Sequence, residues 1–267
     1  MTAEIVNRHW FDAYEAFVGD LGGEFRHYGT VGAFLGGVPL PFANGCLIIA
    51  PAEPDDLDEA LTWVSAANVP FFARLDESLV PRHAGVLARH KLVRDPEPMP
   101  GMVLMPILHS PDPAPGIEVA PVDDDSYADF VQTLIDTGLP TEWAERTFAR
   151  HLLAAEHLRF FLARLDGRPV GTSLAMQTGV VGGIYSVGTV EDVRRRGVGT
   201  AVTWAAVDQI RDWGCTAAVL QSSTMGYPVY RSMGFEGVVR YARFKPALGD
   251  PVSGAETSEE QHSQDDG

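Results

Sequence analysis

The chain has 267 residues and a formal net charge of −16 at pH 7. A surface this acidic repels a phosphate backbone, so nucleic acid is excluded as a partner. No apolar run reaches the roughly 18 residues that cross a membrane, and the first residues lack the apolar core of a signal peptide. We therefore expect a cytoplasmic protein without a membrane partner.

Two cysteines, Cys46 and Cys215, lie far apart in apolar surroundings. They predict buried reduced thiols, because neither belongs to a disulfide framework or to a metal-ligand spacing. No metal is expected.

The first 110 residues alternate between helix and strand patterns, which predicts an α/β unit. The expected helices cover residues 3–18, 57–67 and 80–90, and the expected strands cover residues 25–35, 46–50, 70–75, 92–94 and 102–105. The next segment, residues 106–116, is rich in proline and sustains neither helix nor sheet. We therefore assign residues 1–110 to a first domain that ends at this segment.

Residues 117–246 form the second predicted domain, again with a mixed α/β order. Its expected helices cover residues 124–137, 141–154 and 201–213, and its expected strands cover residues 117–122, 158–165, 169–177, 184–190, 217–220 and 236–244. Asp166-Gly167 is a favourable turn pair and predicts a hairpin. Residues 247–267 contain no lysine or arginine and are poor in apolar residues, so we predict a disordered acidic tail.

Residues 194–200 read Arg-Arg-Arg-Gly-Val-Gly-Thr, between an expected strand and an expected helix. Glycines let a phosphate approach the backbone, and the first N–H groups of a helix have no helical partners. The segment lacks the Gly-x4-Gly-Lys-Ser/Thr of a P-loop, and Val202 stands where a dinucleotide fingerprint has Gly or Ala. Arginines bind phosphates bidentately, so the pattern predicts a site for a ligand with several phosphates.

Arg194-x-x-Gly197-x-Gly199 resembles a motif of the GCN5-related N-acetyltransferase (GNAT) family, which holds the pyrophosphate of acetyl-CoA there. Tyr230-x-x-x-Gly234-Phe235 resembles a later element of the same family. The resemblance covers roughly residues 117–245 and implies an α/β fold with a mixed sheet. It also implies acetyl-CoA as the co-substrate.

Matched position by position, the resemblance implies cofactor contacts along one strand, around the arginine–glycine turn and before the Tyr230 helix. These contacts are Val187, Gly188, Thr189, Arg194, Arg195, Arg196, Gly197, Val198, Gly199, Thr200, Ser223 and Gly226. Ser223 stands where many members carry an asparagine, and Gly226 where they carry an alanine.

The resemblance implies transfer of an acetyl group from acetyl-CoA to the amine of a small molecule, by direct attack in a ternary complex. It assigns protonation of the departing thiolate to Tyr230, and a backbone N–H near residues 187–189 would support the oxyanion. The candidates for the general base are Glu191 and Glu142, or a water relay. The alternative is a non-catalytic acyl-CoA-binding or regulatory module. The acceptor amine, the acyl preference and the choice between monomer and homodimer stay open.

The first half repeats part of the order of the second, which predicts a degenerate copy of the same fold; an unrelated α/β cap is the alternative. Residues 50–56 stand where the arginine–glycine turn is expected, and they contain three acids and no glycine. Carboxylates at a helix N-terminus stabilise the helix but repel a pyrophosphate. When the two halves are aligned, Ala88 takes the position of Tyr230, and its side chain has no proton to donate. We expect one active site per chain, in the second half.

Overall fold

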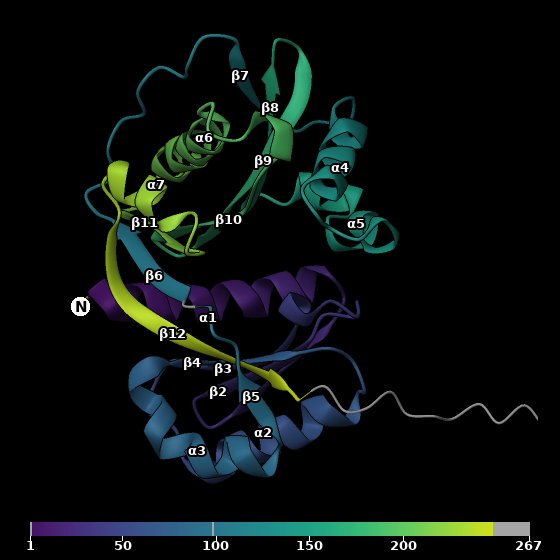
Figure 1. The fold of residues 1–267 in the computed structure, drawn as a ribbon, viewed down its shortest axis with the longest axis vertical. Coiled ribbons are helices and arrows are strands. Elements are labelled where there is room, and N and C mark those ends of the chain that lie inside the picture. Colours follow the sequence, from purple (N-terminus) through teal and green to yellow (C-terminus); the bar gives the residue numbers. More distant parts are fainter. Residues whose placement is uncertain (1, 98, 248–267) are drawn as a thin grey trace, which may run out of the picture.

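The computed structural model describes residues 2–97 and 99–247 of the chain. They fold around one 12-stranded sheet, and the mixed α/β prediction is confirmed (Figure 1). The strand order is β1-β2-β3-β4-β12-β6-β11-β10-β9-β8-β7, with β5 paired to β12. Apart from Ala247, the predicted acidic tail lies outside the described residues.

The elements of the N-terminal half match the expected segments within a few residues. The helices are α1 (Thr2–Asp20), α2 (Pro54–Ala66) and α3 (Val80–Arg89), with 3-10 turns η1 (Pro41–Ala43) and η2 (Glu77–Leu79). The strands are β1 (Glu24–Tyr28), β2 (Val31–Leu35), β3 (Asn44–Ile48), β4 (Phe72–Asp76), β5 (Leu92–Arg94) and β6 (Met99–Leu104).

The C-terminal half contains the remaining elements. The helices are α4 (Tyr127–Asp136), α5 (Thr141–Thr147), α6 (Val198–Asp212) and α7 (Tyr227–Ser232), with 3-10 turns η3 (Arg150–Ala154) and η4 (Glu191–Val193). The strands are β7 (Ile117–Pro121), β8 (Leu158–Leu165), β9 (Arg168–Thr178), β10 (Val181–Thr189), β11 (Ala217–Gln221) and β12 (Glu236–Pro246). Asp166 and Gly167 both have positive φ, 51° and 84°, between β8 and β9. The predicted hairpin is therefore confirmed, with the backbone that a type I′ turn requires.

The single helix predicted over residues 141–154 is wrong, because α5 ends at Thr147. Phe148 leaves helical geometry (φ −121°, ψ 52°), and its ring packs against Phe130 and Phe160 at centroid distances of 6.1 Å. Its carbonyl accepts a hydrogen bond of 3.0 Å from the Tyr127 hydroxyl. Burial of an aromatic ring thus prevails over helical periodicity at this point.

The two halves exchange strands at the centre of the sheet. β12 pairs with β6 through residues 236–241, with β4 through residues 241–244, and with β5 at its end. β6, from the first 110 residues, lies between β11 and β12. Backbone pairing therefore crosses the predicted boundary between residues 110 and 117, which marks a loop in the chain.

The segments from β2 to β4 and from β9 to β11 share one order of elements but differ in how far one strand pair extends. β2–β3 are antiparallel and β3–β4 parallel around α2, and β9–β10 and β10–β11 repeat this around α6. β3 stays paired with β4 up to its last residue, Ile48. β10, by contrast, pairs with β11 only over Val181–Gly183 and then continues to Thr189 along β9 alone. Beyond Gly183, the edge of β10 that faces β11 is therefore unpaired. The corresponding edge of β3 is paired with β4 to the end of the strand.

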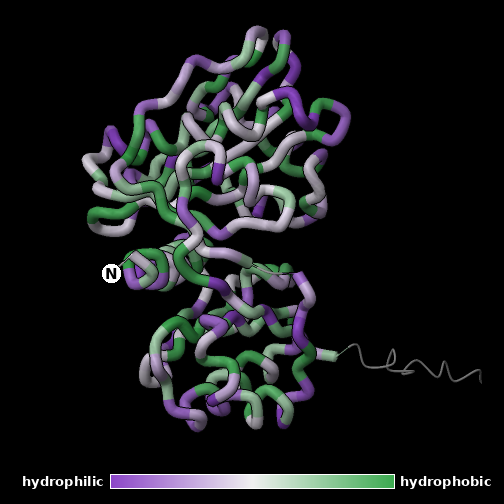
Figure 2. Tube along the Cα trace, turned by 60° about the vertical axis from the view of Figure 1, so that its left-hand side comes forward, coloured by the Kyte–Doolittle hydropathy of each residue, from purple (hydrophilic) through white to green (hydrophobic). Residues whose placement is uncertain are grey.

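Helix α1 lies between the two halves (Figures 1 and 2). Its Val6 and Trp10 share a buried apolar cluster with Leu47 of the first half and Val219 of the second. Helix α1 therefore joins the two cores, and it also contacts β10.

Both cysteines are buried free thiols, and burial raises the pKa of each. Over residues 2–97 and 99–247, no helix is long and apolar enough to cross a bilayer. The same residues contain no group of three His, Cys, Asp or Glu placed to hold a metal ion.

Candidate functional site

The arginine–glycine turn ends at the N-terminus of α6. Arg195 and Gly197 have positive φ, 64° and 89°, and the Gly197 carbonyl accepts the first helical hydrogen bond, from Ala201 N–H at 2.9 Å. By helix geometry, the N–H groups of Val198 and Gly199 have no partner within α6. Together with the helix dipole they form a site that favours an anion.

Strand β10 leads to this turn and presents its open edge beside it. Where β10 separates from β11, Val187, Gly188 and Thr189 carry backbone groups that β11 does not pair. A bulge between Tyr185 and Gly188 interrupts the pairing with β9, and Ser186 has a φ of 51°. An extended ligand can therefore pair with the edge of β10 as an added strand would.

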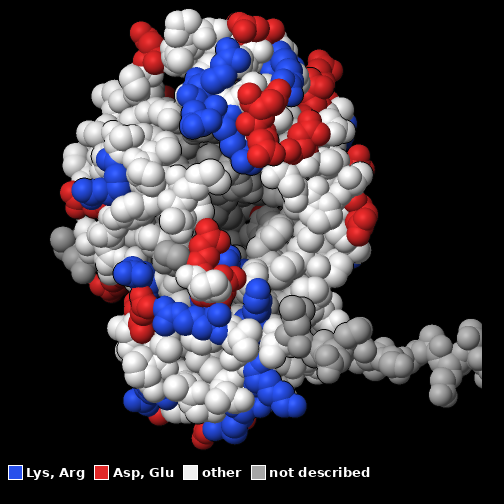
Figure 3. Space-filling view, viewed as in Figure 1, with Lys and Arg blue, Asp and Glu red and all other residues white. Residues whose placement is uncertain are grey.

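A cavity of about 640 Å³ joins the turn, the open edge of β10 and helix α7. Its lining residues are Thr137, Val187, Gly188, Thr189, Arg194, Arg195, Gly197, Val198, Gly199, Thr200, Ser223, Met225, Gly226, Val229 and Tyr230. The structure thus brings together every predicted cofactor-contact residue except Arg196, which is exposed outside the lining. Figure 3 shows a hollow over β10, between the surface of α6 and α7 and that of α4 and α5.

Tyr230 closes one side of this cavity. Burial raises its pKa to about 12, against a smaller opposing effect of a hydrogen bond with Thr203. Its ring meets Phe235 edge-on, with centroids 6.0 Å apart. A hydroxyl with this pKa stays protonated at neutral pH. Close by, Gly226 N–H donates to Ser223 Oγ at 3.1 Å, which fixes the start of α7.

A second cavity, of about 420 Å³, adjoins the first and shares Thr137, Val187 and Gly188 with it. Its lining residues are Ala13, Tyr14, Phe17, Phe42, Leu134, Thr137, Gly138, Leu139, Phe148, Leu174, Met176, Tyr185, Ser186, Val187 and Gly188. Sequence reasoning missed the contribution of α1 and η1, since neither segment carries a motif. A ligand in each cavity would meet the other at Gly188.

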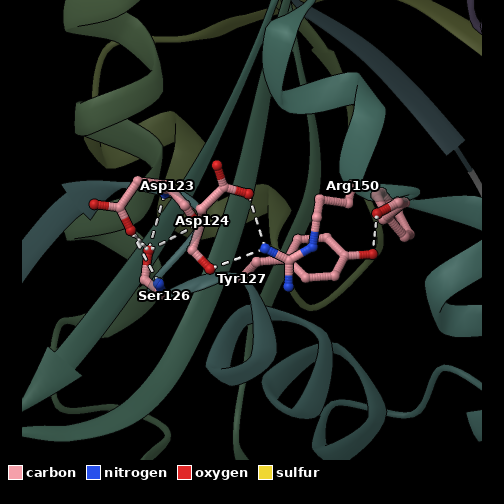
Figure 4. Close-up of polar contacts among 6 residues, drawn as sticks. Asp123, Asp124, Ser126, Tyr127 and Arg150 are labelled. Carbon is pink, nitrogen blue, oxygen red and sulfur yellow. Dashed lines mark hydrogen bonds and ion pairs between the residues drawn. The ribbon is translucent and has the colours of Figure 1, made fainter.

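Figure 4 shows the polar contacts at the start of α4. Asp123 and Ser126 exchange backbone-to-side-chain hydrogen bonds of 2.9 Å before the first turn of α4, which is why α4 begins later than predicted. Arg150 donates to Asp124 Oδ1 at 2.8 Å and lies over the Tyr127 ring, 4.3 Å from its centroid. Since Tyr127 also bonds the Phe148 carbonyl, the cluster fixes a wall residue of the second cavity.

The two candidate bases are exposed and line neither cavity. Glu191 lies 3.7 Å from Arg194 in an ion pair, with 86% of its side chain exposed, and Glu142 lies in the first turn of α5. Their role in the reaction stays a prediction.

The comparisons with known proteins agree with this geometry. The family model described as the acetyltransferase (GNAT) family matches residues 127–235, which hold the whole first cavity. The C-terminal half of the chain belongs to the GNAT family. Members of this family use acetyl-CoA and acetylate amines. No curated protein matches the sequence significantly.

Solved structures extend the similarity of fold beyond the GNAT domain. A GCN5-related N-acetyltransferase from Kribbella flavida is 22% identical with a TM-score of 0.68, over 90% of this chain and 96% of that one. One from Sphaerobacter thermophilus is 18% identical with a TM-score of 0.57, over 71% and 66%. A tandem GNAT protein from the clavulanic acid biosynthesis pathway is 17% identical with a TM-score of 0.54, over 73% and 70%. The first of these alignments spans both halves, so the similarity of fold includes the N-terminal half.

Proposed function

We propose that the protein transfers an acetyl group from acetyl-CoA to the amine of a small molecule, at one site in its C-terminal half. The observation that carries this proposal is the first cavity, which unites an anion site, an open strand edge and a neutral tyrosine. In the N-terminal half, β3 and β4 stay paired and acids occupy the start of α2. The described residues of that half therefore form no corresponding opening between these two strands.

Three parts of the cavity bind three parts of the co-substrate. Arg194, Arg195 and the N-terminus of α6 hold the pyrophosphate, and the open edge of β10 pairs with the pantetheine amides. The thioester then lies near Gly188, where the two cavities meet. Holding both reactants there supplies roughly 7–11 kcal/mol of the barrier by proximity and orientation.

The reaction forms one N–C bond and breaks one C–S bond. The amine nitrogen attacks the thioester carbonyl carbon, and free backbone N–H groups of β10 support the oxyanion. When the C–S bond breaks, the sulfur takes a proton from the Tyr230 hydroxyl. The nitrogen releases a proton through water, and Tyr230 regains one from solvent. The products are the N-acetylated amine and CoA. Glu142→Gln and Glu191→Gln test by their kcat whether either acid receives the amine proton.

Cofactor binding is tested by adding a charge in the anion site. Gly199 is the second residue of α6, and a Cβ there would lie in ordinary contact, 3.4 Å from Thr189 Oγ1. Gly199→Glu keeps the helix, because an acid stabilises its N-terminus, but it should abolish CoA binding measured by calorimetry. Gly85→Glu on α3, where a Cβ meets no atom within 4 Å, is the matched control. Undiminished binding to Gly199→Glu would refute the site.

The chemical step is tested by removing one hydroxyl. Tyr230→Phe should lower kcat by about 10² or more, the usual range for a general acid, with CoA affinity unchanged. Tyr227→Phe, on the same helix but outside the cavity lining, should leave kcat as it is. If CoA binds, no amine in a broad panel is acetylated and Tyr230→Phe has no effect, the protein is an acyl-CoA-binding module instead.

A further inference from the structure

The second cavity has walls from both halves of the chain. Ala13, Tyr14 and Phe17 come from α1 and Phe42 from η1. The C-terminal end of α4 and the strands β9 and β10 close the other side. Its volume, about 420 Å³, lies within the range of roughly 300–1,000 Å³ for small-molecule sites. A small acceptor can therefore enter it and place one end at Gly188.

The lining of this cavity is almost wholly apolar. None of the described residues that form it is Asp, Glu, Lys, Arg or His. The Thr137 hydroxyl is already used, since it donates to the Leu134 carbonyl at 2.9 Å. Tyr14, Tyr185 and Ser186 add neutral hydroxyls to the lining but no charge. A second ammonium on the acceptor would therefore lose water here without gaining a charged partner.

The same apolar lining favours the reactive form of the amine. Transfer from water into an apolar site disfavours the charged form of a base and lowers its pKa. The cavity therefore favours a neutral amine at the end of β10 without any carboxylate in its lining. An apolar body behind the nitrogen gains burial against Phe17, Phe42 and Phe148 at the same time.

The walls from the N-terminal half are held by a buried cation. Arg74 on β4 is 3% exposed and donates to the carbonyls of Pro41 and Phe42, each at 3.3 Å. Its guanidinium also lies 5.3 Å from the centre of the Tyr14 ring. One side chain thus positions both η1 and the aromatic face of α1.

We propose that this cavity is the acceptor site and that it selects an amine carried on an apolar, aromatic body. The N-terminal half supplies the walls that set this selectivity. The assignment rests on the proposed acetyl transfer for its chemistry, but the cavity's ligand class can be tested by binding alone.

Two amines of similar length test the selectivity: 3-phenylpropylamine and 1,6-diaminohexane, which carries a second ammonium in place of the ring. With acetyl-CoA as donor, kcat/KM from thiol release should be about tenfold or more higher for 3-phenylpropylamine. Equal values, or a preference for the diamine, would overturn the inference and leave the proposed acetyl transfer intact.

A charge placed in the wall tests the location. Phe17→Glu should lower the ratio of kcat/KM for 3-phenylpropylamine to kcat/KM for 1,6-diaminohexane about tenfold. The reason is that a carboxylate pairs with the second ammonium of the diamine and disfavours an apolar ring beside it. Phe11→Glu is the matched control: Phe11 is half-buried on the same helix, packs on Phe25 and lies outside the lining. A ratio measured on one protein does not depend on its folded fraction. An unchanged ratio in Phe17→Glu would contradict the proposed location.

Binding separates this inference from the proposed function. Calorimetry with 3-phenylpropylamine on the CoA-saturated protein should show binding that Phe17→Glu weakens and Phe11→Glu retains. Such binding without any acetyl transfer would support the apolar pocket and remove the proposed function. No binding of 3-phenylpropylamine, to the free or the CoA-saturated protein, would overturn the inference.

Discussion

Three consecutive arginines precede α6, yet the structure gives them different positions. Arg194 and Arg195 line the first cavity, whereas Arg196 does not. We expect Arg195→Ala to weaken CoA binding about tenfold, since a charged hydrogen bond contributes roughly 1.5–3 kcal/mol and exposure puts this one at the lower end. Arg196→Ala removes the same charge and should cost about twofold or less. If calorimetry shows that both variants lose the same CoA affinity, the arginines act through the local electrostatic field and not through a direct contact.

His9, on α1, makes stability depend on pH. It is 2% exposed, its Nδ1 lies 2.6 Å from Thr178 Oγ1, and burial lowers its pKa from 6.5 to about 3. The folded protein therefore keeps His9 neutral, while the unfolded chain protonates it below pH 6.5. The contribution of neutral His9 to the free energy of unfolding is therefore complete above pH 6.5. It is lost as the pH falls toward 3, by about 1.4 kcal/mol per pH unit.

The expected consequence is measurable by urea unfolding at pH 7 and pH 5. Between these values the wild-type chain should lose about 2 kcal/mol more than His9→Asn, because the variant lacks this one titration. Other groups, including the buried His83, are common to both proteins and cancel. Equal losses in the two proteins would show that His9 is protonated in the folded state.

At the scale of elements, η1 depends on β4. Arg74 is the contact between them, so Arg74→Met should free Phe42 and raise KM for an apolar amine, while the Kd for CoA stays unchanged. Arg243→Met is the control. The guanidinium groups of Arg74 and Arg243 both lie over Phe72, 5.2 and 4.7 Å from the ring centre, but Arg243 donates to Asp95 rather than to η1. A rise in KM with both variants would indicate a general loosening of the sheet.

The sequence predicts an element well when residues close together in the chain determine it. The Asp166-Gly167 hairpin and the turn before α6 follow from residues within a few positions of each other, and both are present. The break at Phe148 depends on a core that forms from distant segments, so helical periodicity missed it. The acceptor cavity combines α1 and η1 with β9 and α4, which share no motif; only the folded chain brings them together.

The whole molecule is held together by strands that each half places in the other. Apolar alternation identifies β6 and β12 as strands but does not state their partners, so the exchange could not be read from the sequence. Since β12 lies between β4 and β6, and α1 packs on both cores, neither half can lose its fold without exposing the buried edge of the other. We therefore expect the two predicted domains to unfold as one cooperative unit.

Leu75→Ala tests this cooperativity from the N-terminal half. Leu75 is fully buried on β4 and stands opposite Ala242 of β12. Its truncation should lower the free energy of unfolding by about 2–5 kcal/mol. Scanning calorimetry should show one transition in both proteins, and CoA binding at the other end of the molecule should be lost at the same lowered midpoint. Two transitions, of which only the first shifts while CoA binding persists to the second, would show instead that the halves unfold independently.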